Sequence, residues 1–386
     1  MKKFVLAPDS FKESMTAKEV CVAMEKGIRK VFSDAEIVHV PMADGGEGTV
    51  ESLVDATNGY KEYVEVQGPL PKQKVRAYYG ILGDKKTAVI EMAQASGLML
   101  VDPKVRNPLV TTTYGTGELI KAALNKGVST IIIGIGGSAT VDGGIGMAQA
   151  LGVKFTDKYG NNIEPTGRGL TKIDKISMEN LDKRVKKVNF IIASDVENIL
   201  TGKKGAAAVF GPQKGATPDE VELLDKGLIH YAEIIRRDIG KNVEDIAGSG
   251  AAGGLGAGLI AFLDAKLQSG VEVVANTVEL AEKISQADYV FTGEGGMDFQ
   301  TKYGKTPFGV AQVAKKYQKP VFAEVGYLGE RIEELYDIGI SAIFGIVDKS
   351  ESIEESLEKG PQNVERTTEN IARLISSIIN KKNILA

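Results

Sequence analysis

Short apolar runs rich in β-branched and aromatic residues alternate with helical patterns along this chain, and that alternation restricts the fold more than any other feature. Residues 4–7 form the first such run, and residues 16–31 follow with apolar side chains at three- and four-residue spacing. Thr16 and Glu19 have the spacing of a helical capping box, and residues 36–40 form the next strand-like run. Strands and helices in this order are typical of a parallel sheet covered by helices, so the sequence predicts an α/β fold.

The pattern changes at residues 60–82, where two alternating runs flank a Gly-Pro-Leu-Pro segment and predict a β-hairpin. From residue 288 the first pattern returns, with predicted strands at 289–292, 320–325 and 342–346, and it ends in a long amphipathic helix near residues 363–379. A chain of 386 residues suits two domains. We therefore predict one discontinuous domain of residues 1–60 and 286–386, and an inserted mixed α/β domain of residues 61–285. The insert is expected to contain strands at 87–93, 130–134 and 189–194 and helices at 117–125 and 218–239.

Composition excludes several classes of function. The formal net charge is −4, which argues against a protein that follows nucleic-acid phosphates. One cysteine and two histidines cannot supply a zinc cluster or an intramolecular disulfide. No apolar run approaches the length of a membrane span, and Pro8 and Asp9 interrupt the first apolar run too early for a signal peptide. We therefore expect a cytoplasmic protein with no membrane or nucleic-acid partner.

Glycine is abundant and concentrated: it accounts for 45 of 386 residues, about 12%, against about 7% in an average protein. The dense segments are residues 44–48, 134–146 and 248–258. Glycine lets backbone N–H groups approach an anion, but it also permits tight turns and close helix packing, and both interpretations stay open. The candidate nucleotide-binding residues in these segments are Gly136, Gly137, Ser138, Gly253, Gly254 and Gly256.

Two familiar nucleotide motifs fit this chain poorly. Residues 134–139 match a loose form of the dinucleotide fingerprint, with Asp157 about 20 residues on, so an NAD-dependent dehydrogenase is one alternative. However, Gly143-Gly144-Ile145-Gly146 would begin a helix later than the fingerprint requires. Gly304-Lys305-Thr306 ends like a Walker A loop, but Phe299 occupies the position of its first glycine.

Acidic residues recur just after the predicted strands. Ligands of open α/β sheets bind beyond the carboxyl ends of the strands, so these acids could converge on one site, where Mg²⁺ bridging nucleotide phosphates would offset their repulsion. Each acid could equally be a helix cap or a turn residue. Lys12, Arg106 and Lys305 are nearby cations suited to a phosphate or a carboxylate. These groups match the requirements of phosphoryl transfer, whereas a GxSxG elbow is absent. The acids are Asp9, Asp44, Asp142, Asp195, Glu294 and Asp298.

Several longer segments resemble the bacterial glycerate kinase family almost from end to end. That resemblance implies ATP-dependent phosphorylation of D-glycerate, with 2-phosphoglycerate as the more common product. It also implies a flavodoxin-like, three-layer domain built from both chain ends, an inserted domain, and an active site in the cleft that separates them. The segments are APDSFK at 7–12, PMADGGEGT at 41–49, RNPL at 106–109, TTTYGTGE at 111–118, IGIGGSAT at 133–140, VFGPQKGAT at 209–217, GGLGAG at 253–258 and TGEG at 292–295.

The resemblance and the strand-end pattern together give a set of predicted roles. The cofactors are ATP and Mg²⁺, and the chain is expected to be a monomer or a homodimer. Three residues depart from the family pattern: Val141 replaces the usual Asn, Ser194 replaces Cys or a similar residue, and Gly296 replaces the usual Arg. Because of Gly296, a non-catalytic sensor that binds a phosphorylated metabolite is a second alternative. The predicted catalytic residues are Asp195, Lys12 and Asp9; the substrate-binding residues are Arg106, Ser10, Asp44 and Glu47; Glu294 and Lys305 join the nucleotide-binding glycines; and Asp298 and Asp142 are the metal ligands.

Overall fold

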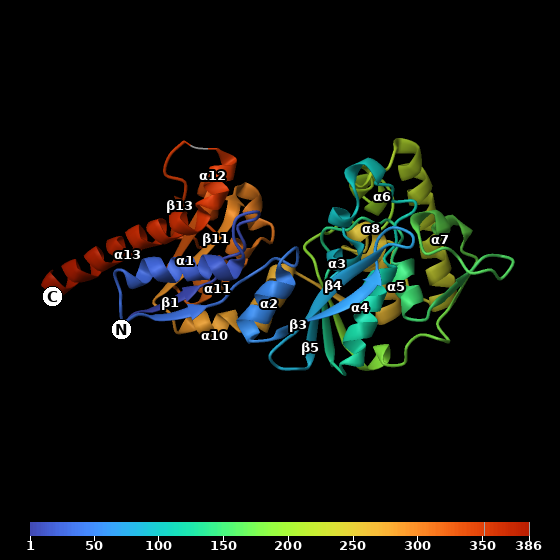
Figure 1. Ribbon diagram of the computed structural model, residues 1–386, viewed down its shortest axis with the longest axis horizontal. Coiled ribbons are helices and arrows are strands. Elements are labelled where there is room, and N and C mark those ends of the chain that lie inside the picture. The colour runs from blue at the N-terminus through green and yellow to red at the C-terminus, as the bar shows by residue number, and fades with distance from the viewer. Residues whose placement is uncertain (351, 386) are drawn as a thin grey trace. The chain divides into compact units, whose positions relative to one another are not determined.

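A computed structural model describes residues 1–350 and 352–385 of the chain, and the chain divides into two compact units (Figure 1). Unit 1 comprises Met1–Asp44, Glu51–Thr57 and Val271–Ala386, and unit 2 comprises Gly45–Val50 and Asn58–Gly270. Each unit is built on a sheet with parallel strands and covering helices, which confirms the predicted α/β class.

The sheet of unit 1 has five parallel strands in the order β13-β12-β11-β1-β2. Alternate residues of its strands face opposite helical layers, because successive side chains of a strand point to opposite faces. Phe4 and Phe291 belong to a core with α1 and α13, whereas Ala323 belongs to a core with α11. The elements are β1 (Lys3–Leu6), α1 (Ala17–Arg29), β2 (Glu36–His39), α2 (Thr49–Thr57), α9 (Gly270–Thr277), α10 (Leu280–Ser285), β11 (Tyr289–Met297), η6 (Phe299–Lys302), α11 (Thr306–Lys316), β12 (Val321–Leu328), η7 (Ile332–Leu335), β13 (Ala342–Gly345), α12 (Ile353–Glu358) and α13 (Gly360–Leu385).

The sheet of unit 2 has six strands in the order β10-β9-β6-β5-β4-β3. Pairing is parallel from β10 to β5 and antiparallel from β5 to β3. The elements are β3 (Tyr60–Gln67), β4 (Lys74–Ile81), β5 (Thr87–Glu91), α3 (Ala93–Ser96), η1 (Leu98–Leu100), η2 (Pro103–Val105), α4 (Tyr114–Asn125), β6 (Thr130–Gly134), α5 (Ile145–Ala150), β7 (Lys154–Thr156), η3 (Gly167–Lys172), β8 (Lys175–Ser177), η4 (Val185–Lys187), β9 (Asn189–Ala193), α6 (Ala206–Phe210), η5 (Pro212–Lys214), α7 (Pro218–Ile239), α8 (Ala251–Leu263) and β10 (Lys266–Gln268).

Local sequence signals fix several of these boundaries. The capping box of Thr16 and Glu19 is present at the start of α1, and an equivalent box of Thr217 and Glu220 begins α7. The predicted hairpin is the β3–β4 pair, and β6 has the predicted bounds. Several bounds differ from the expectation: β5 ends at Glu91 rather than residue 93, α4 begins at Tyr114 rather than residue 117, and β11 continues five residues beyond residue 292, to Met297. The third glycine segment has left-handed backbone conformations at residues 252–254, before the regular turns of α8 begin.

The second and third glycine segments pack directly against each other. The Gly143 N–H donates to the Gly253 carbonyl oxygen over 3.0 Å. A Cβ atom at Gly253 would lie 1.9 Å from the Thr140 carbonyl oxygen, and one at Gly256 would lie 2.4 Å from the Gly248 carbonyl oxygen. Close backbone packing therefore explains these glycines, since any larger residue would collide with backbone atoms.

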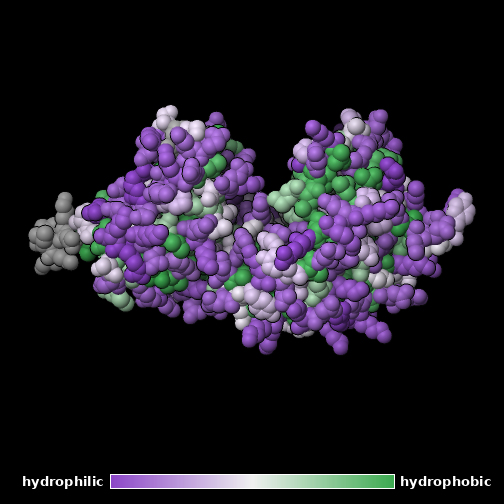
Figure 2. Space-filling view, in the orientation of Figure 1, coloured by the Kyte–Doolittle hydropathy of each residue, from purple (hydrophilic) through white to green (hydrophobic). Residues whose placement is uncertain are grey.

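The surface is mostly hydrophilic in the view of Figure 2, with an apolar area over α6, where Val209 is 44% exposed. Within the part of the chain that the structure describes, no helix is long and apolar enough to cross a membrane. Cys21 is a buried free thiol on α1, and burial raises its pKa.

Substitution of Gly253 by alanine tests the packing of the two glycine segments. Gly253 and Gly240 both have positive φ, but a Cβ at Gly240 would have no neighbour within 4 Å. We expect Gly240→Ala to cost about 1 kcal/mol from backbone strain alone. We expect Gly253→Ala to cost about 3 kcal/mol or more, since overpacking adds to that strain. Thermal unfolding of both variants measures the difference, and equal losses of stability would contradict the packing argument.

Candidate functional site

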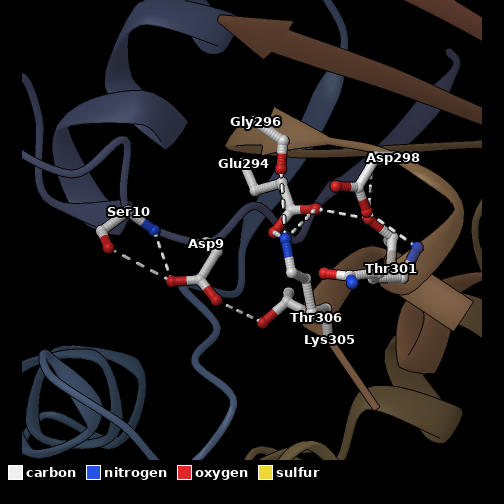
Figure 3. A network of polar contacts seen from close by, with 9 residues as sticks. Asp9, Ser10, Glu294, Gly296, Asp298, Thr301, Lys305 and Thr306 are labelled. Carbon is white, nitrogen blue, oxygen red and sulfur yellow. Dashed lines mark hydrogen bonds and ion pairs between the residues drawn. The ribbon is translucent and has the colours of Figure 1, made fainter. Parts of the chain in front are cut away.

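Acidic residues from two neighbouring strands meet at the carboxyl end of the unit 1 sheet (Figure 3). Asp9 follows β1, and Glu294 lies in the second half of β11. The Thr306 hydroxyl at the start of α11 donates to Asp9 Oδ2 over 2.5 Å, and the Ser10 N–H donates to Asp9 Oδ1 over 2.6 Å. The fold thus joins residues almost 300 positions apart in the sequence.

Lys305 places a cation beside this cluster. Its Nζ lies 3.3 Å from Glu294 Oε2 and donates to the Gly296 carbonyl oxygen over 3.2 Å. Lys305 is also the N-cap residue of α11, so its ammonium group lies near the positive end of that helix dipole. The Thr301 hydroxyl donates to Glu294 Oε1 over 2.9 Å and helps to fix that carboxylate. The arrangement offers a lysine and a helix N-terminus to an anionic group.

Burial and like charges make the carboxyl of Asp9 hard to ionise. Loss of water and, to a smaller extent, the negative charge of Asp44 together raise the pKa of Asp9 to about 7, although the hydrogen bonds from Thr306 and Ser10 act in the opposite direction. Burial also raises the pKa of Glu294, although Lys305 opposes that change. The carboxyl groups of Asp9, Asp44 and Glu294 therefore repel one another when they are ionised. A cation bound beside them would stabilise their ionised forms.

The carboxylate oxygens of this cluster suit a Mg²⁺ ion that also binds the phosphates of a nucleotide. No group of three or more acidic, histidine or cysteine side chains forms a ready metal cage among the residues with described placement. Mg²⁺ commonly takes only one or two protein carboxylates and completes its shell with water and phosphate. The oxygens of Asp9, Asp44 and Glu294 are of the right type for that mode of binding.

The two residues predicted as metal ligands have other partners. Asp298 caps η6, and its Oδ1 accepts from the Gln300 N–H over 2.7 Å. Asp142 is completely buried in unit 2, and its carboxylate accepts hydrogen bonds from Thr113, Gly144 and Gly146. A metal at Asp142 would displace these donors, so the geometry assigns it to holding the loop that precedes α5.

The turn after β6 is the second candidate site and lies in unit 2. Gly136 and Gly137 are exposed, whereas the next residue, Ser138, is only 7% exposed. Lys214, at the end of η5, is buried beneath this turn. Its Nζ donates to Ser138 Oγ and to the Thr140 carbonyl oxygen, each over 2.7 Å. This lysine fixes the shape of a turn whose exposed glycines can offer backbone N–H groups to an anion.

Lys214 is the residue of this site that reasoning from residue types missed. Its burial lowers its pKa to about 7, although the charge of Asp142 acts in the opposite direction. The backbone of Arg106 packs against the next residue, since a Cβ at Gly215 would lie 2.2 Å from the Arg106 carbonyl oxygen. The VFGPQKGAT segment was a signal for Lys214, but the sequence alone does not distinguish a buried lysine from a solvated one.

The remaining predicted residues are placed as follows. Asp195 is exposed after β9, and its Oδ2 accepts from the Gly270 N–H over 3.3 Å. Lys12 and Glu47 are also exposed, in units 1 and 2 respectively. Among the departures from the family pattern, Val141 is in the core of unit 2.

Gly296 and Ser194 also have clear structural settings. A Cβ at Gly296 would make only ordinary contact with Tyr327, at 3.8 Å, so the backbone leaves room for a side chain there. Ser194 Oγ accepts from the Val196 N–H over 3.3 Å, in the loop that carries Asp195. Neither departure disrupts the local backbone.

Comparisons with known proteins agree across nearly the whole chain. A model of the glycerate kinase family matches residues 4–376. A glycerate kinase from Haemophilus influenzae is 52% identical over 97% of this chain and 99% of its own length, and a glycerate 2-kinase from Escherichia coli is 49% identical over 97% and 98%. A crystal structure from Salmonella typhimurium LT2, provisionally assigned as glycerate kinase 2, superposes with a TM-score of 0.89 at 48% identity, covering 98% of this chain and 99% of that one. The chain therefore belongs to the glycerate kinase family and is an enzyme.

The pKa of Asp9 predicts how stability depends on pH. The unfolded chain loses this proton near the ordinary pKa of 3.8, whereas the folded protein keeps it until about pH 7. Wild-type stability therefore falls as pH rises through that window. The side chain of Asp9→Asn cannot ionise. The melting temperature of this variant minus that of the wild type should therefore rise by several degrees between pH 4 and pH 8. Melting curves of the ligand-free proteins test this, and a difference that is constant with pH would contradict it.

Proposed function

We propose that this chain transfers the γ-phosphoryl group of ATP to D-glycerate and forms 2-phosphoglycerate. The observation that carries this proposal is the full-length similarity to relatives named glycerate kinase, one of which is named glycerate 2-kinase. The site chemistry supports it, because phosphoryl transfer needs cations, phosphate-binding backbone and a carboxylate near the acceptor hydroxyl. Groups of these kinds occur in each unit.

Two places on the chain are suited to the phosphates of ATP. In unit 1, Lys305 and the first turn of α11 present an ammonium group and backbone N–H groups. In unit 2, the Gly136-Gly137 turn presents backbone N–H groups held in shape by Lys214 through Ser138. One or two of the carboxylates of Asp9, Asp44 and Glu294 would hold Mg²⁺, which supplies charge neutralisation to the transferring phosphoryl group when bound.

The substrate roles are assigned by charge and hydrogen-bonding capacity. Arg106 has the planar guanidinium that pairs best with the carboxylate of glycerate, and Lys12 and Ser10 are further donors for it. Glu47 and Asp44 would accept hydrogen bonds from the glycerate hydroxyls. Asp195 is the general base: its carboxylate is exposed after β9, where it can be reached by the attacking hydroxyl and accept its proton.

Phosphorus NMR of the reaction products tests the activity and the position of the new ester together. ATP, Mg²⁺ and D-glycerate are supplied with the enzyme, and the expected result is ADP and the resonance of 2-phosphoglycerate. A resonance of 3-phosphoglycerate would correct the position while keeping the activity. Absence of glycerate-dependent ADP release would overturn the proposal and favour a metabolite sensor, and saturable binding of NADH would favour the dehydrogenase.

Substitution of the proposed base separates its role from general effects of charge. Asp195→Asn keeps the size of the side chain but removes its basicity, so we expect kcat to fall by about 10²-fold or more. The control is Glu179→Gln, at an exposed carboxylate two residues after β8, and it should keep wild-type kcat. Unchanged turnover in Asp195→Asn would remove Asp195 from the role of base.

Two lysines of the same loop test the proposed nucleotide contact. Lys305 faces Glu294 and caps α11, whereas Lys302 forms an ion pair with Glu334 over 2.6 Å. We expect Lys305→Met to lower kcat/KM for ATP by about tenfold or more, because a charge-assisted contact to phosphate is lost. Lys302→Met should change it by less than about twofold. Steady-state kinetics with varied ATP measures both, and similar losses in the two variants would count against the Lys305 contact.

A further inference from the structure

The six-stranded sheet of unit 2 ends at β3, which is paired only with β4 in the described sheet (Figure 1). This edge strand is eight residues long and contains no proline. Proteins usually shorten, bend or cover such an edge, because its outward N–H and C=O groups can pair with a strand of another molecule. The length and regularity of β3 therefore point to a surface that can add a strand.

The hydrogen-bond pattern shows which residues of β3 direct their backbone groups outward. The Gly68 N–H donates to the Gln73 carbonyl oxygen over 2.8 Å, so the even-numbered residues before it direct their backbone groups toward β4. Gln67 agrees with this alternation, because its N–H points away from β4 and donates to Glu118 Oε2 of α4 over 2.6 Å. Lys61, Tyr63 and Glu65 consequently direct their N–H and C=O groups away from β4.

The side chains of these three residues lie on one face of the sheet. Tyr63 is 54% exposed, its ring lies 5.7 Å from that of Tyr78, and the Arg76 guanidinium lies 4.7 Å from its centroid. Tyr63 is thus a large aromatic group that is already ordered by contacts within the chain but remains open to solvent. Lys61 and Glu65 carry opposite charges two residues to either side of it.

We infer that β3 pairs antiparallel with β3 of a second copy of this chain, about a two-fold axis that passes next to Tyr63. Residues that face each other in this register have numbers that add up to 126. Tyr63 then faces Tyr63 of the second copy, and Lys61 faces its Glu65 on both sides of the axis. Each residue whose backbone groups point outward then faces a residue of the second copy whose backbone groups also point outward, as an antiparallel ladder requires.

Other registers with the same backbone compatibility are less favourable. Centring the axis at Lys61 places two lysines opposite each other, and centring it at Glu65 places two glutamates together. In the registers between these, Lys61 of one copy does not face Glu65 of the other. Opposite charges directly across a sheet stabilise pairing, and like charges oppose it, so the register at Tyr63 is selected. The backbone contacts of Gln67 with α4 confine the ladder to residues 61–65.

A cysteine crosslink tests the position of the axis. In the proposed dimer the two Cα atoms of residue 63 are about 5.5 Å apart, within reach of a disulfide. The two copies of residue 60 are about 20 Å apart, because six residues of strand separate them. Tyr63→Cys should therefore form a covalent dimer under mild oxidation, and Tyr60→Cys, at a similarly exposed position on the same strand, should not. The natural Cys21 is buried and does not interfere.

Charge reversal tests the register without a covalent bond. Sedimentation velocity over about 1–100 μM should show a concentration-dependent dimer for the wild type. Lys61→Glu and Glu65→Lys each place like charges together twice, so each should weaken dimerisation by about tenfold or more. The double variant exchanges the two charges and should recover most of the wild-type affinity. All variants should keep wild-type kinase activity, which reports that the units remain folded.

Three results would overturn the inference. The first is a wild-type protein that remains monomeric over the whole concentration range. The second is crosslinking of Tyr60→Cys as fast as that of Tyr63→Cys, which would mean random collision. The third is a dimer that the single charge reversals leave unchanged, which would place the interface elsewhere on the chain.

Discussion

The close approach of two glycine segments is the constraint on which the structure of unit 2 depends. Gly143 and Gly253 are joined by a hydrogen bond, and no Cβ atom fits at Gly253. This contact fixes α8 against the loop that carries Asp142, and Asp142 in turn holds the backbone at the start of α5. The turn after β6 is then supported from below by Lys214. A flexible residue type thus produces a rigid arrangement, because its small size allows backbone to contact backbone.

Each unit also contains a buried ionisable group whose protonation state changes near neutral pH. Burial raises the pKa of Asp9 to about 7 in unit 1 and lowers that of Lys214 to about 7 in unit 2. The physical cause is the same, since loss of water disfavours the charged form of an acid and of a base alike. Groups with shifted pKa values are concentrated at functional sites, and both residues lie at the places assigned to phosphate and metal binding.

The regular elements were largely predictable from local patterns. Capping boxes marked the starts of α1 and α7, and alternation marked the β3–β4 hairpin. The parts that local patterns predicted least well are rich in glycine. Gly253 and Gly254 have left-handed conformations just before the regular turns of α8, where close packing requires glycine, and the glycines in the second half of β11 concealed a strand that pairs with β12. A Cβ at Gly293 would lie 2.2 Å from the Glu324 carbonyl oxygen, a constraint that no local pattern reveals.

The sequence by itself determined the alternation of strands and helices, the placement of Asp9 and Asp195 just after strands, and membership of a kinase family. These properties depend on residue order and on spacing over short distances. Only the tertiary structure decided which groups meet: Thr306 with Asp9, Lys305 with Glu294, and Lys214 with Ser138. The reason is that burial, and with it the energy of a charge, depends on neighbours brought together from distant parts of the chain. Spacing along the sequence could therefore propose Asp142 as a metal ligand, but only its buried surroundings showed that backbone N–H groups already occupy its carboxylate.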